Sequence, residues 1–324
     1  MRIIESANKS GTYNLVLERY LVENYQEDTF IIWTNDPGIY VGKNQNTLEE
    51  INQTFIDDNN LEVFRRLSGG GTIFHDQNTV YYSFITKNKR EVKDNFIHFN
   101  NIVTDFLNTV NVEAVLSGRN DVLVNGRKVS GSAEYYYEDI LVHHGSLLFN
   151  TDTAFLAQAL TPNKKKFISK AVNSVKARVD NIVNYTNLNV AEFKKVFVNY
   201  VLDRFNGVKK SVSPNENIKT LKMIENKYGT WEWNYGKSPA YSFTKDEKYP
   251  FGIVKVDLNV SKGLIKDISI TGDFFSEADV SELEKQLIGI KYDMKEIEET
   301  LKDVEVTKYI VGADLKNILE LMRN

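Results

Sequence analysis

The dipeptide Asn-Gly at residues 125–126 lies between two short segments in which apolar and polar residues alternate. This combination predicts a β-hairpin with a two-residue type I′ turn, and such a turn sets the register of its two strands. We expect Asp121 to lie opposite Ser130, with both residues and Lys128 on one polar face of the hairpin. Lys128 and Asp121 would then be diagonal neighbours, roughly 7–8 Å apart, and both side chains could reach one ligand. The simpler interpretation is a half-exposed surface ion pair, which contributes ~0–1 kcal/mol.

A second segment, RRLSGGGTIFHD at residues 65–76, places three glycines between two predicted strands. Glycines leave backbone N–H groups uncovered by Cβ atoms and accept backbone angles that other residues avoid. Such a loop can form a concave site for a phosphate or carboxylate group, and Arg66 would supply positive charge beside it. The segment lacks the Lys-Ser/Thr of a P-loop and the spacing of a dinucleotide-binding motif. A plain glycine-rich turn is an equally good interpretation of the segment alone.

Length and composition exclude several classes of function. The chain has 324 residues, which suits two domains, and no cysteine, which excludes disulfides, thiolate metal sites and cysteine nucleophiles. A net charge of −4 argues against a general nucleic-acid-binding role. No segment approaches the ~18 consecutive apolar residues of a membrane-spanning helix, and the N-terminus carries no apolar export segment. We therefore expect a cytoplasmic protein whose partners are neither nucleic acid nor membrane.

The order of predicted elements indicates the fold class. Strands and helices are mixed along the first part rather than strictly alternating, which favours an α+β fold over a parallel βαβ array. Turn-forming and charged residues gather at 235–250 and mark a domain boundary, after which we expect strands from residue 251 onward. The expected domains are residues 1–243 and a small α+β domain over 244–324. Periodicity and capping signals predict helices over 13–27, 47–58 and 214–228, the last opened by Ser213, Pro214 and a capping-box Glu216.

Several segments taken together resemble those of the lipoate–protein ligases. RRLSGGGTIFHD is similar to the family's RRxSGGGxVxHD loop, and GRNDVLVNGRKVSGSA is similar to its GRND…K(V/I)SGxA segment. HHGSLL, NKKKFISKAVNSVKARV and TWEWNYG also fall in the expected order. The similarity spans almost the whole chain, including the C-terminal domain of the longer members. The order and spacing of the motifs carry the resemblance, because no single motif is decisive.

The resemblance implies a fold and a reaction. The fold is the biotin/lipoate-ligase catalytic fold, α+β with mixed sheets flanked by helices and related to class II aminoacyl-tRNA synthetases, followed by a small α+β accessory domain. Lipoate and Mg-ATP give lipoyl-AMP and pyrophosphate. The lipoyl group then passes to a lysine of a lipoyl domain in a 2-oxoacid dehydrogenase E2 subunit or of the glycine-cleavage H protein. ATP and Mg²⁺ are the expected cofactors, octanoate is a possible second substrate, and a monomer is expected.

Site residues are carried over by their positions in these motifs. Lys128 corresponds to the essential lysine that bridges the acyl carbonyl and the α-phosphate, Asp121 is a candidate Mg²⁺ ligand, and residues 164–182 resemble the loop that covers the adenylate. The residues expected at the ATP or lipoyl-AMP site are Arg66, Gly71, Thr72, Ile73, Phe74, Asp121, Lys128 and Ser130. The residues expected at the lipoate site are Gly69, Gly70, Gly71, His75, Lys128, His144 and Gly145.

The sequence departs from the family pattern in three places. Asn78-Thr79 stands where Gly-Asn is usual, Ala171 replaces a frequent Gly, and Lys176 replaces a frequent Arg. Lys176 keeps the positive charge but lacks the fork with which arginine binds phosphate in a bidentate manner. These changes bear on loop closure and substrate preference more than on the type of reaction.

Other functions compete with this interpretation. Octanoyl and lipoyl transferases of the same fold use a cysteine nucleophile, which this chain lacks, and biotin ligases carry a Gly-Arg-Gly-Arg-type loop that is missing from the sequence. The non-enzymatic alternative is a lipoate-binding or lipoyl-domain-binding protein without adenylation activity. Arg66, Lys128 and the glycine loop argue against that alternative.

Overall fold

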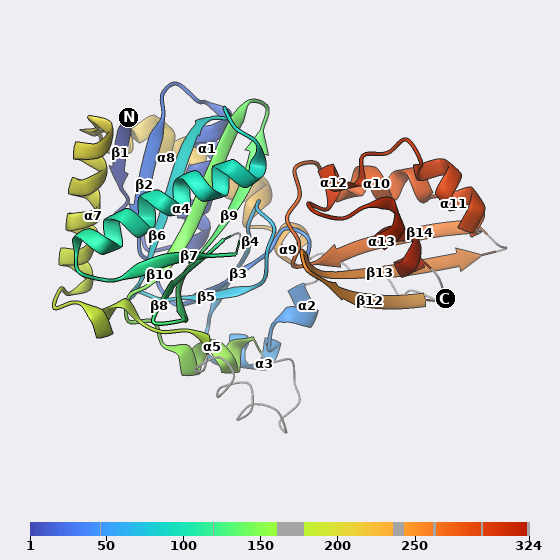
Figure 1. Cartoon of the computed structure of the whole chain (residues 1–324), viewed down its shortest axis with the longest axis horizontal. Coiled ribbons are helices and arrows are strands. Elements are labelled where there is room, and N and C mark those ends of the chain that lie inside the picture. Colours follow the sequence, from blue (N-terminus) through green and yellow to red (C-terminus); the bar gives the residue numbers. More distant parts are fainter. Residues whose placement is uncertain are drawn as a thin grey trace.

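The computed structural model describes residues 1–45, 47–118, 120–160, 178–235, 243–261, 264–292 and 294–322. Ala171, Lys176 and most of the expected covering loop lie outside these ranges. Figure 1 shows a larger body built around a broad sheet and a smaller body, coloured orange to red, formed by the C-terminal part of the chain. The class predicted from the sequence, α+β with mixed sheets flanked by helices, is confirmed.

An eight-stranded mixed sheet forms the centre of the larger body, in the order β11-β1-β2-β6-β10-β9-β8-β7. Strand β1 pairs in parallel with β2 and β11, whereas the other neighbours are antiparallel. The strands are β1 (Arg2–Glu5), β2 (Thr29–Trp33), β6 (Thr79–Lys87), β7 (Ala114–Ser117), β8 (Asp121–Val124), β9 (Arg127–Tyr137), β10 (Ile140–Leu148) and β11 (Val208–Lys209).

Helices cover both faces of this sheet (Figure 1). None of the described helices combines the length and apolar character needed to cross a bilayer. The helices of the larger body are α1 (Gly11–Glu23), α2 (Thr47–Glu50), α3 (Gln53–Asp58), α4 (Val92–Thr109), α5 (Thr153–Ala159), α7 (Val190–Phe205), α8 (Pro214–Met223), α9 (Trp231–Asn234), the 3₁₀ turn η1 (Ile182–Tyr185) and the π-helical turn η2 (Ile224–Tyr228).

The helix predictions are confirmed in position and corrected at their ends. The helix predicted over 13–27 ends at Glu23. The prediction of one continuous helix over 47–58 is wrong, because the Asn52 side chain accepts a hydrogen bond from the Phe55 amide and so begins a separate helix, α3. The helix predicted over 214–228 passes from α-helix to π-helix after Met223. Its capping box at Ser213 is confirmed.

The central strands are buried on both faces, and each face has its own apolar core. Successive residues of a strand point to opposite faces, so Phe30 and Ile32 of β2 pack in the core under α4 and α7. The alternate residues, Ile31 and Trp33, pack in the core under α1. The two cores hold the middle of the sheet as a rigid support, which carries the β6 and β10 residues that reach the site.

A second sheet of three strands, in the order β4-β3-β5, completes the larger body. Its strands are β3 (Gly38–Val41), β4 (Glu62–Arg65) and β5 (Ile73–His75). The glycine loop, defined here as residues 66–72, joins β4 to β5. Since β3 pairs with both strands, the two ends of the loop are held on either side of the same strand.

The smaller body has a sheet in the order β12-β13-β14 and an apolar core of its own. The expectation that strands begin only at residue 251 is wrong, because 243–249 forms β12 and pairs with β13 over its full length. Turn and charged residues dominate that stretch, so the composition alone predicts a linker. The elements are β12 (Phe243–Tyr249), β13 (Gly252–Ser261), β14 (Leu264–Gly272), α10 (Val280–Leu287), α11 (Met294–Leu301), α12 (Val306–Tyr309) and α13 (Leu315–Met322).

An ion pair ties the first strand to helix α8. Arg2 donates from Nη1 and Nη2 to Oε1 and Oε2 of Glu216 at 2.5 and 2.9 Å. Glu216 also accepts a hydrogen bond from the Ser213 amide as part of the capping box. The Arg2 hydrogen bond is the largest cause that lowers the pKa of Glu216 to about 2.

Glu216 is therefore expected to make stability depend on pH in acid. A carboxylate whose folded-state pKa is lowered stabilises the protein above its ordinary pKa of 4.5, and this contribution is lost as the pH falls towards 2. We expect Glu216→Gln to be less stable than the wild type in urea unfolding at pH 7, with the difference shrinking between pH 4.5 and 2. Glu5→Gln is the control, because the exposed Glu5–Lys209 pair should contribute ~0–1 kcal/mol. A pH-independent difference for Glu216→Gln would contradict the prediction.

Candidate active site

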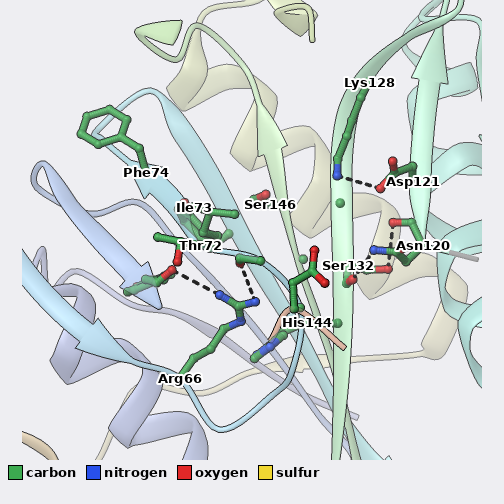
Figure 2. Close-up of a pocket in the computed structure, with 18 of the residues that line it drawn as sticks. Arg66, Thr72, Ile73, Phe74, Asn120, Asp121, Lys128, Ser132, His144 and Ser146 are labelled. Carbon is green, nitrogen blue, oxygen red and sulfur yellow. Dashed lines mark hydrogen bonds and ion pairs between the residues drawn. The ribbon is translucent and has the colours of Figure 1, made fainter. Parts of the chain in front are cut away.

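A pocket of about 540 Å³ lies between the glycine loop, the β8–β9 hairpin and the middle of the large sheet. Its volume falls within the range of small-molecule sites. Figure 2 shows Arg66 on one side of the pocket and Lys128 with Asp121 on the other. The wall includes Leu15, Trp33, Tyr40, Arg66, Gly70, Gly71, Thr72, Ile73, Phe74, Tyr81, Asn120, Asp121, Lys128, Gly131, Ser132, Ala133, His144, Gly145 and Ser146, and from the smaller body Pro250, Phe251, Gly252, Asp273 and Phe275.

The hairpin brings Lys128 and Asp121 together at the pocket wall. Asn125 and Gly126 both have positive φ, as the predicted type I′ turn requires. Lys128 Nζ lies 2.7 Å from Asp121 Oδ1, and each side chain is more than a third exposed. Gly131 makes room for this pair, because a Cβ there would lie 2.9 Å from Lys128 Cε and Nζ. The ammonium group is thus held in place but remains open to a ligand.

The expected position of Ser130 is wrong by one residue. The register shifts between Val122 and Leu123, so Asp121 pairs with Gly131 and Ser130 pairs with Val122. This β-bulge turns Ser130 towards the core, where it is fully buried and outside the pocket wall. The Asn-Gly turn alone predicts regular alternation, and it carries no signal of an extra residue in the second strand.

Arg66 holds the glycine loop in shape. Its Nη2 donates to the carbonyl oxygens of Gly69 and Gly71 at 2.7 and 2.8 Å, and its Nε donates to Ser68 Oγ at 3.1 Å. Burial lowers the pKa of Arg66 to about 10, so the guanidinium is charged at neutral pH. Gly70 has a φ of +92°, which residues with a Cβ rarely adopt. The loop is therefore a fixed, positively charged concavity rather than a plain turn.

Thr72 is fixed by a neighbouring segment. Its Oγ1 donates to Gln45 Oε1 at 2.8 Å, and the same oxygen accepts the Gly42 amide at 2.8 Å. Gly42 must be glycine, because a Cβ would lie 1.9 Å from the Gly70 carbonyl oxygen. The strand that ends at Val41 therefore runs in direct contact with the loop.

The deep end of the pocket is largely apolar. Leu15 of α1, Trp33 of β2 and Tyr81 of β6 form this part of the wall, together with His144 and Gly145 of β10. His144 Nε2 lies 2.6 Å from Ser68 Oγ, and its Nδ1 lies 2.9 Å from Glu18 Oε2. Reasoning from motifs missed Leu15, Trp33, Tyr81 and Glu18. The only signal for Glu18 is a charged residue among the apolar positions of α1.

Two residues expected at the lipoate site are not part of the pocket wall. His75 is fully buried, packs against the Tyr40 ring at a tilt and hydrogen-bonds the Asp36 carbonyl oxygen through Nδ1 at 2.9 Å. Burial lowers the pKa of His75 to about 3, so its ring is neutral. Gly69 faces the smaller body, where a Cβ would lie 2.2 Å from the Phe274 carbonyl oxygen. His75 therefore lies behind the loop, and Gly69 lies on the side of the loop that meets the smaller body.

The smaller body closes one side of the pocket. The Gly70 amide donates to the Phe274 carbonyl oxygen at 3.2 Å, and the Gly272 amide donates to the Asn44 carbonyl oxygen at 2.6 Å. The Phe275 ring packs against Phe96 of α4, with centroids 5.4 Å apart. The segment after β14 is therefore in contact with the glycine loop and with the large sheet's helix layer.

No group of three or more His, Cys, Asp or Glu side chains within the described ranges is arranged to hold a metal ion. Two carboxylates, those of Asp121 and Asp273, do line the pocket wall. Mg²⁺ in phosphate-transfer sites is commonly held by one or two carboxylates plus the phosphates of the substrate. The donor set at the pocket therefore fits Mg²⁺ carried by a nucleotide better than a permanent metal centre.

Comparison with known protein families agrees with this geometry. A family model described as the lipoyl protein ligase A/B catalytic domain matches residues 10–202. A second, described as the bacterial lipoate protein ligase C-terminus, matches residues 238–322. The chain belongs to the lipoate–protein ligase family.

Individual relatives match over nearly the whole chain. Lipoate–protein ligase 1 of Staphylococcus aureus is 37% identical, over 99% of this chain and 100% of its own length. The crystal structure of P. falciparum LipL1 in complex with lipoate has a TM-score of 0.78 at 29% identity, and covers 99% of this chain and 97% of that one. A bipartite ligase from Thermoplasma acidophilum, studied with its E2 lipoyl domain, shares the fold at 20% identity with a TM-score of 0.68, over 75% of this chain and 98% of that one.

A substitution at Gly69 tests whether its contact with the smaller body holds the two bodies together. Gly69→Ala places a Cβ 2.2 Å from the Phe274 carbonyl oxygen and 2.7 Å from Phe275 Cα, so the contact must open. Forcing an atom into a packed contact costs about 1–3 kcal/mol. We expect faster hydrogen exchange in residues 273–276 of this variant.

Gly71→Ala is the matched control in the same loop. Its added Cβ would meet nothing closer than 3.9 Å, and Gly71 has no positive φ. Exchange in 273–276 should stay at the wild-type rate in this variant. Equal exchange rates in the two variants would show that the Gly69 contact does not hold the smaller body.

Proposed function

We propose that this lipoate–protein ligase works in two steps at the pocket. In the first, a carboxylate oxygen of lipoate attacks the α-phosphorus of ATP, and the bond to pyrophosphate breaks to leave lipoyl-AMP. In the second, the amine of an acceptor lysine attacks the acyl carbon, AMP leaves, and the amine loses a proton as the amide forms. The observation that carries this proposal is the ammonium group of Lys128, held on the pocket wall across from a glycine loop built around Arg66.

Lys128 is proposed to offset the charge repulsion between the two substrates in the first step. A carboxylate and a triphosphate repel each other, so a fixed positive charge between them stabilises their approach and the transition state. The Lys128–Asp121 contact of 2.7 Å orients the ammonium before the ligands arrive. Because the pair is about a third exposed, this orientation costs little desolvation.

The glycine loop and Asp121 are proposed to receive the nucleotide. Gly71, Thr72, Ile73 and Phe74 form the loop side of the wall, where backbone N–H groups and Arg66 favour an anion. Asp121 would hold Mg²⁺ together with the phosphates, and the ion would neutralise the charge that develops on pyrophosphate. The acyl tail would extend towards Gly145 and the apolar deep end of the pocket.

The acceptor is proposed to be a lipoyl domain of a 2-oxoacid dehydrogenase E2 subunit or a glycine-cleavage H protein, with lipoate as substrate and octanoate as a second. We expect the acceptor lysine to lose its proton before attack and to be held in line by the docked domain. The catalytic domain is proposed to comprise residues 1–243 and the accessory domain residues 244–324. We also propose that the protein acts as a monomer in the cytoplasm, where ATP is available.

Lys128→Ala tests the chemistry directly. We expect lipoate-dependent ATP–pyrophosphate exchange to fall about 10²–10³-fold, as typically follows removal of one preorganised charged group from a reaction centre. The free energy of unfolding should change by less than about 1 kcal/mol, because a half-exposed ion pair contributes little to stability. Urea unfolding of the same preparation measures the second quantity.

Lys209→Ala is the control, since Lys209 forms a surface pair with Glu5 at the same 2.7 Å separation. Exchange at the wild-type rate is expected for this variant. Full exchange by Lys128→Ala would refute the role of Lys128. A wild-type protein that binds lipoate but shows no exchange would favour the non-enzymatic alternative.

A further inference from the structure

A buried carboxylate lies behind the pocket wall with no role in the two steps above. Glu18 is on the inner face of α1 and is only 1% exposed. Its Oε2 lies 2.9 Å from Nδ1 of His144, which itself lines the pocket. Burying a carboxylate is costly unless it is hydrogen-bonded, so this contact has a structural reason to persist.

Glu18 is one end of a chain of hydrogen bonds that reaches the glycine loop. His144 Nε2 lies 2.6 Å from Ser68 Oγ, and Arg66 Nε donates to the same oxygen at 3.1 Å. We call Glu18, His144, Ser68 and Arg66 the Glu18–Arg66 chain. Ser68 is 1% exposed, so its hydroxyl must find its partner inside the protein.

The donors and acceptors of the Glu18–Arg66 chain allow one consistent arrangement. Arginine can only donate, so the Ser68 hydroxyl oxygen accepts from Arg66 and its single proton goes to His144 Nε2. A carboxylate oxygen of Glu18 accepts from the ring, so His144 Nδ1 carries the ring proton. A ring protonated on both nitrogens would leave the Ser68 proton without a partner.

This arrangement determines what His144 presents to the pocket. Both ring nitrogens are used inside the protein, so the wall receives only the carbon edge and the face of the ring. Of the neighbouring wall residues, Leu15 and Gly145 are apolar, and Trp33 and Tyr81 add aromatic rings. A polar residue is thereby converted into a surface suited to a hydrocarbon or dithiolane tail.

We propose that Glu18 is a positioning residue that fixes His144 as the Nδ1–H tautomer and thereby makes the deep pocket wall select against acyl tails with a polar end. The proposal rests on the proposed function, because it takes the acyl tail to lie beside His144. The substrate class that follows is a medium-length carboxylic acid with an apolar tail. A tail with a terminal hydroxyl would find no hydrogen-bond partner on this ring.

The protein has a matched control pair, His143 and Glu134, on the opposite face of β10. His143 Nδ1 lies 2.8 Å from Glu134 Oε1, and both residues are buried. This pair has the same chemistry as Glu18 and His144, but neither residue lines the pocket. Removing Glu134 therefore tests the effect of losing a buried His–Glu pair as such.

The first experiment determines the tautomer of His144 by nitrogen NMR of the full chain with labelled histidine. The protein has four histidines, so assignment by single substitution is practical. We expect the Nδ1–H form in the wild type and in Glu18→Gln, whose amide oxygen can still accept. Glu18→Met, of similar length without an acceptor, should shift the ring towards the Nε2–H form, and Glu134→Met should leave His144 unchanged.

The second experiment measures selectivity by ATP–pyrophosphate exchange with octanoate and 8-hydroxyoctanoate. We expect the preference for octanoate, as the ratio of kcat/KM values, to fall about tenfold in Glu18→Met and in Ser68→Ala, because the ring nitrogens become free to bond a hydroxyl. The fall should come from KM rather than kcat. Glu18→Gln and Glu134→Met should keep the wild-type ratio.

The double variant Glu18→Met/Ser68→Ala tests whether the Glu18–Arg66 chain acts as a unit. If it does, the combined loss of preference for octanoate stays near tenfold, whereas independent effects multiply to about a hundredfold. An Nε2–H or doubly protonated His144 in the wild type would overturn the proposal, as would unchanged selectivity in Ser68→Ala. Both observations remain available if Glu18→Met does not fold. The NMR experiment measures the tautomer without substrate, so it tests the role of Glu18 alone. A failure of the proposed function would appear separately, as wild-type protein without ATP–pyrophosphate exchange.

Discussion

The burial of Arg66 inside its own loop is the interaction on which the site depends. A guanidinium that donates to the carbonyl oxygens of Gly69 and Gly71 fixes the curve of the backbone around it. The Gly70 amide donates to the Phe274 carbonyl oxygen of the smaller body, while Arg66, Gly70, Gly71 and Thr72 line the pocket. A single buried charge therefore shapes both the loop side of the pocket and the place where the smaller body docks.

The large sheet forms the opposite side of the site. Its central strands are buried on both faces, so the pocket residues of β6 and β10 cannot move without disturbing two cores. The β8–β9 hairpin extends from this support and carries Lys128 to the pocket rim. The bulge in β9 then rotates Gly131 rather than Ser130 under the lysine, which explains how a long side chain fits there beside Asp121.

Local signals in the sequence predicted local structure well. The Asn-Gly turn has the expected positive φ angles at residues 125–126, and Ser213 caps α8 as its motif indicates. Predictions failed where a contact distant in sequence decided the outcome. Strand β12 forms because β13 pairs with it, although its composition resembles a linker. Ser130 is buried because its strand gains a bulge, and His75 lies behind the loop because Asp36 and Tyr40 hold it there.

The sequence by itself determined the class of protein and the hairpin turn, and it pointed to three of the pocket residues, Arg66, Lys128 and Asp121. All of these depend on motifs and on neighbours within a few positions. Only the tertiary structure decided which residues share the pocket. Glu18, Ser68 and His144 are far apart along the chain, and no periodicity links them. Their alignment arises when α1 packs on the sheet beside the glycine loop, since only burial together makes their donors and acceptors each other's partners.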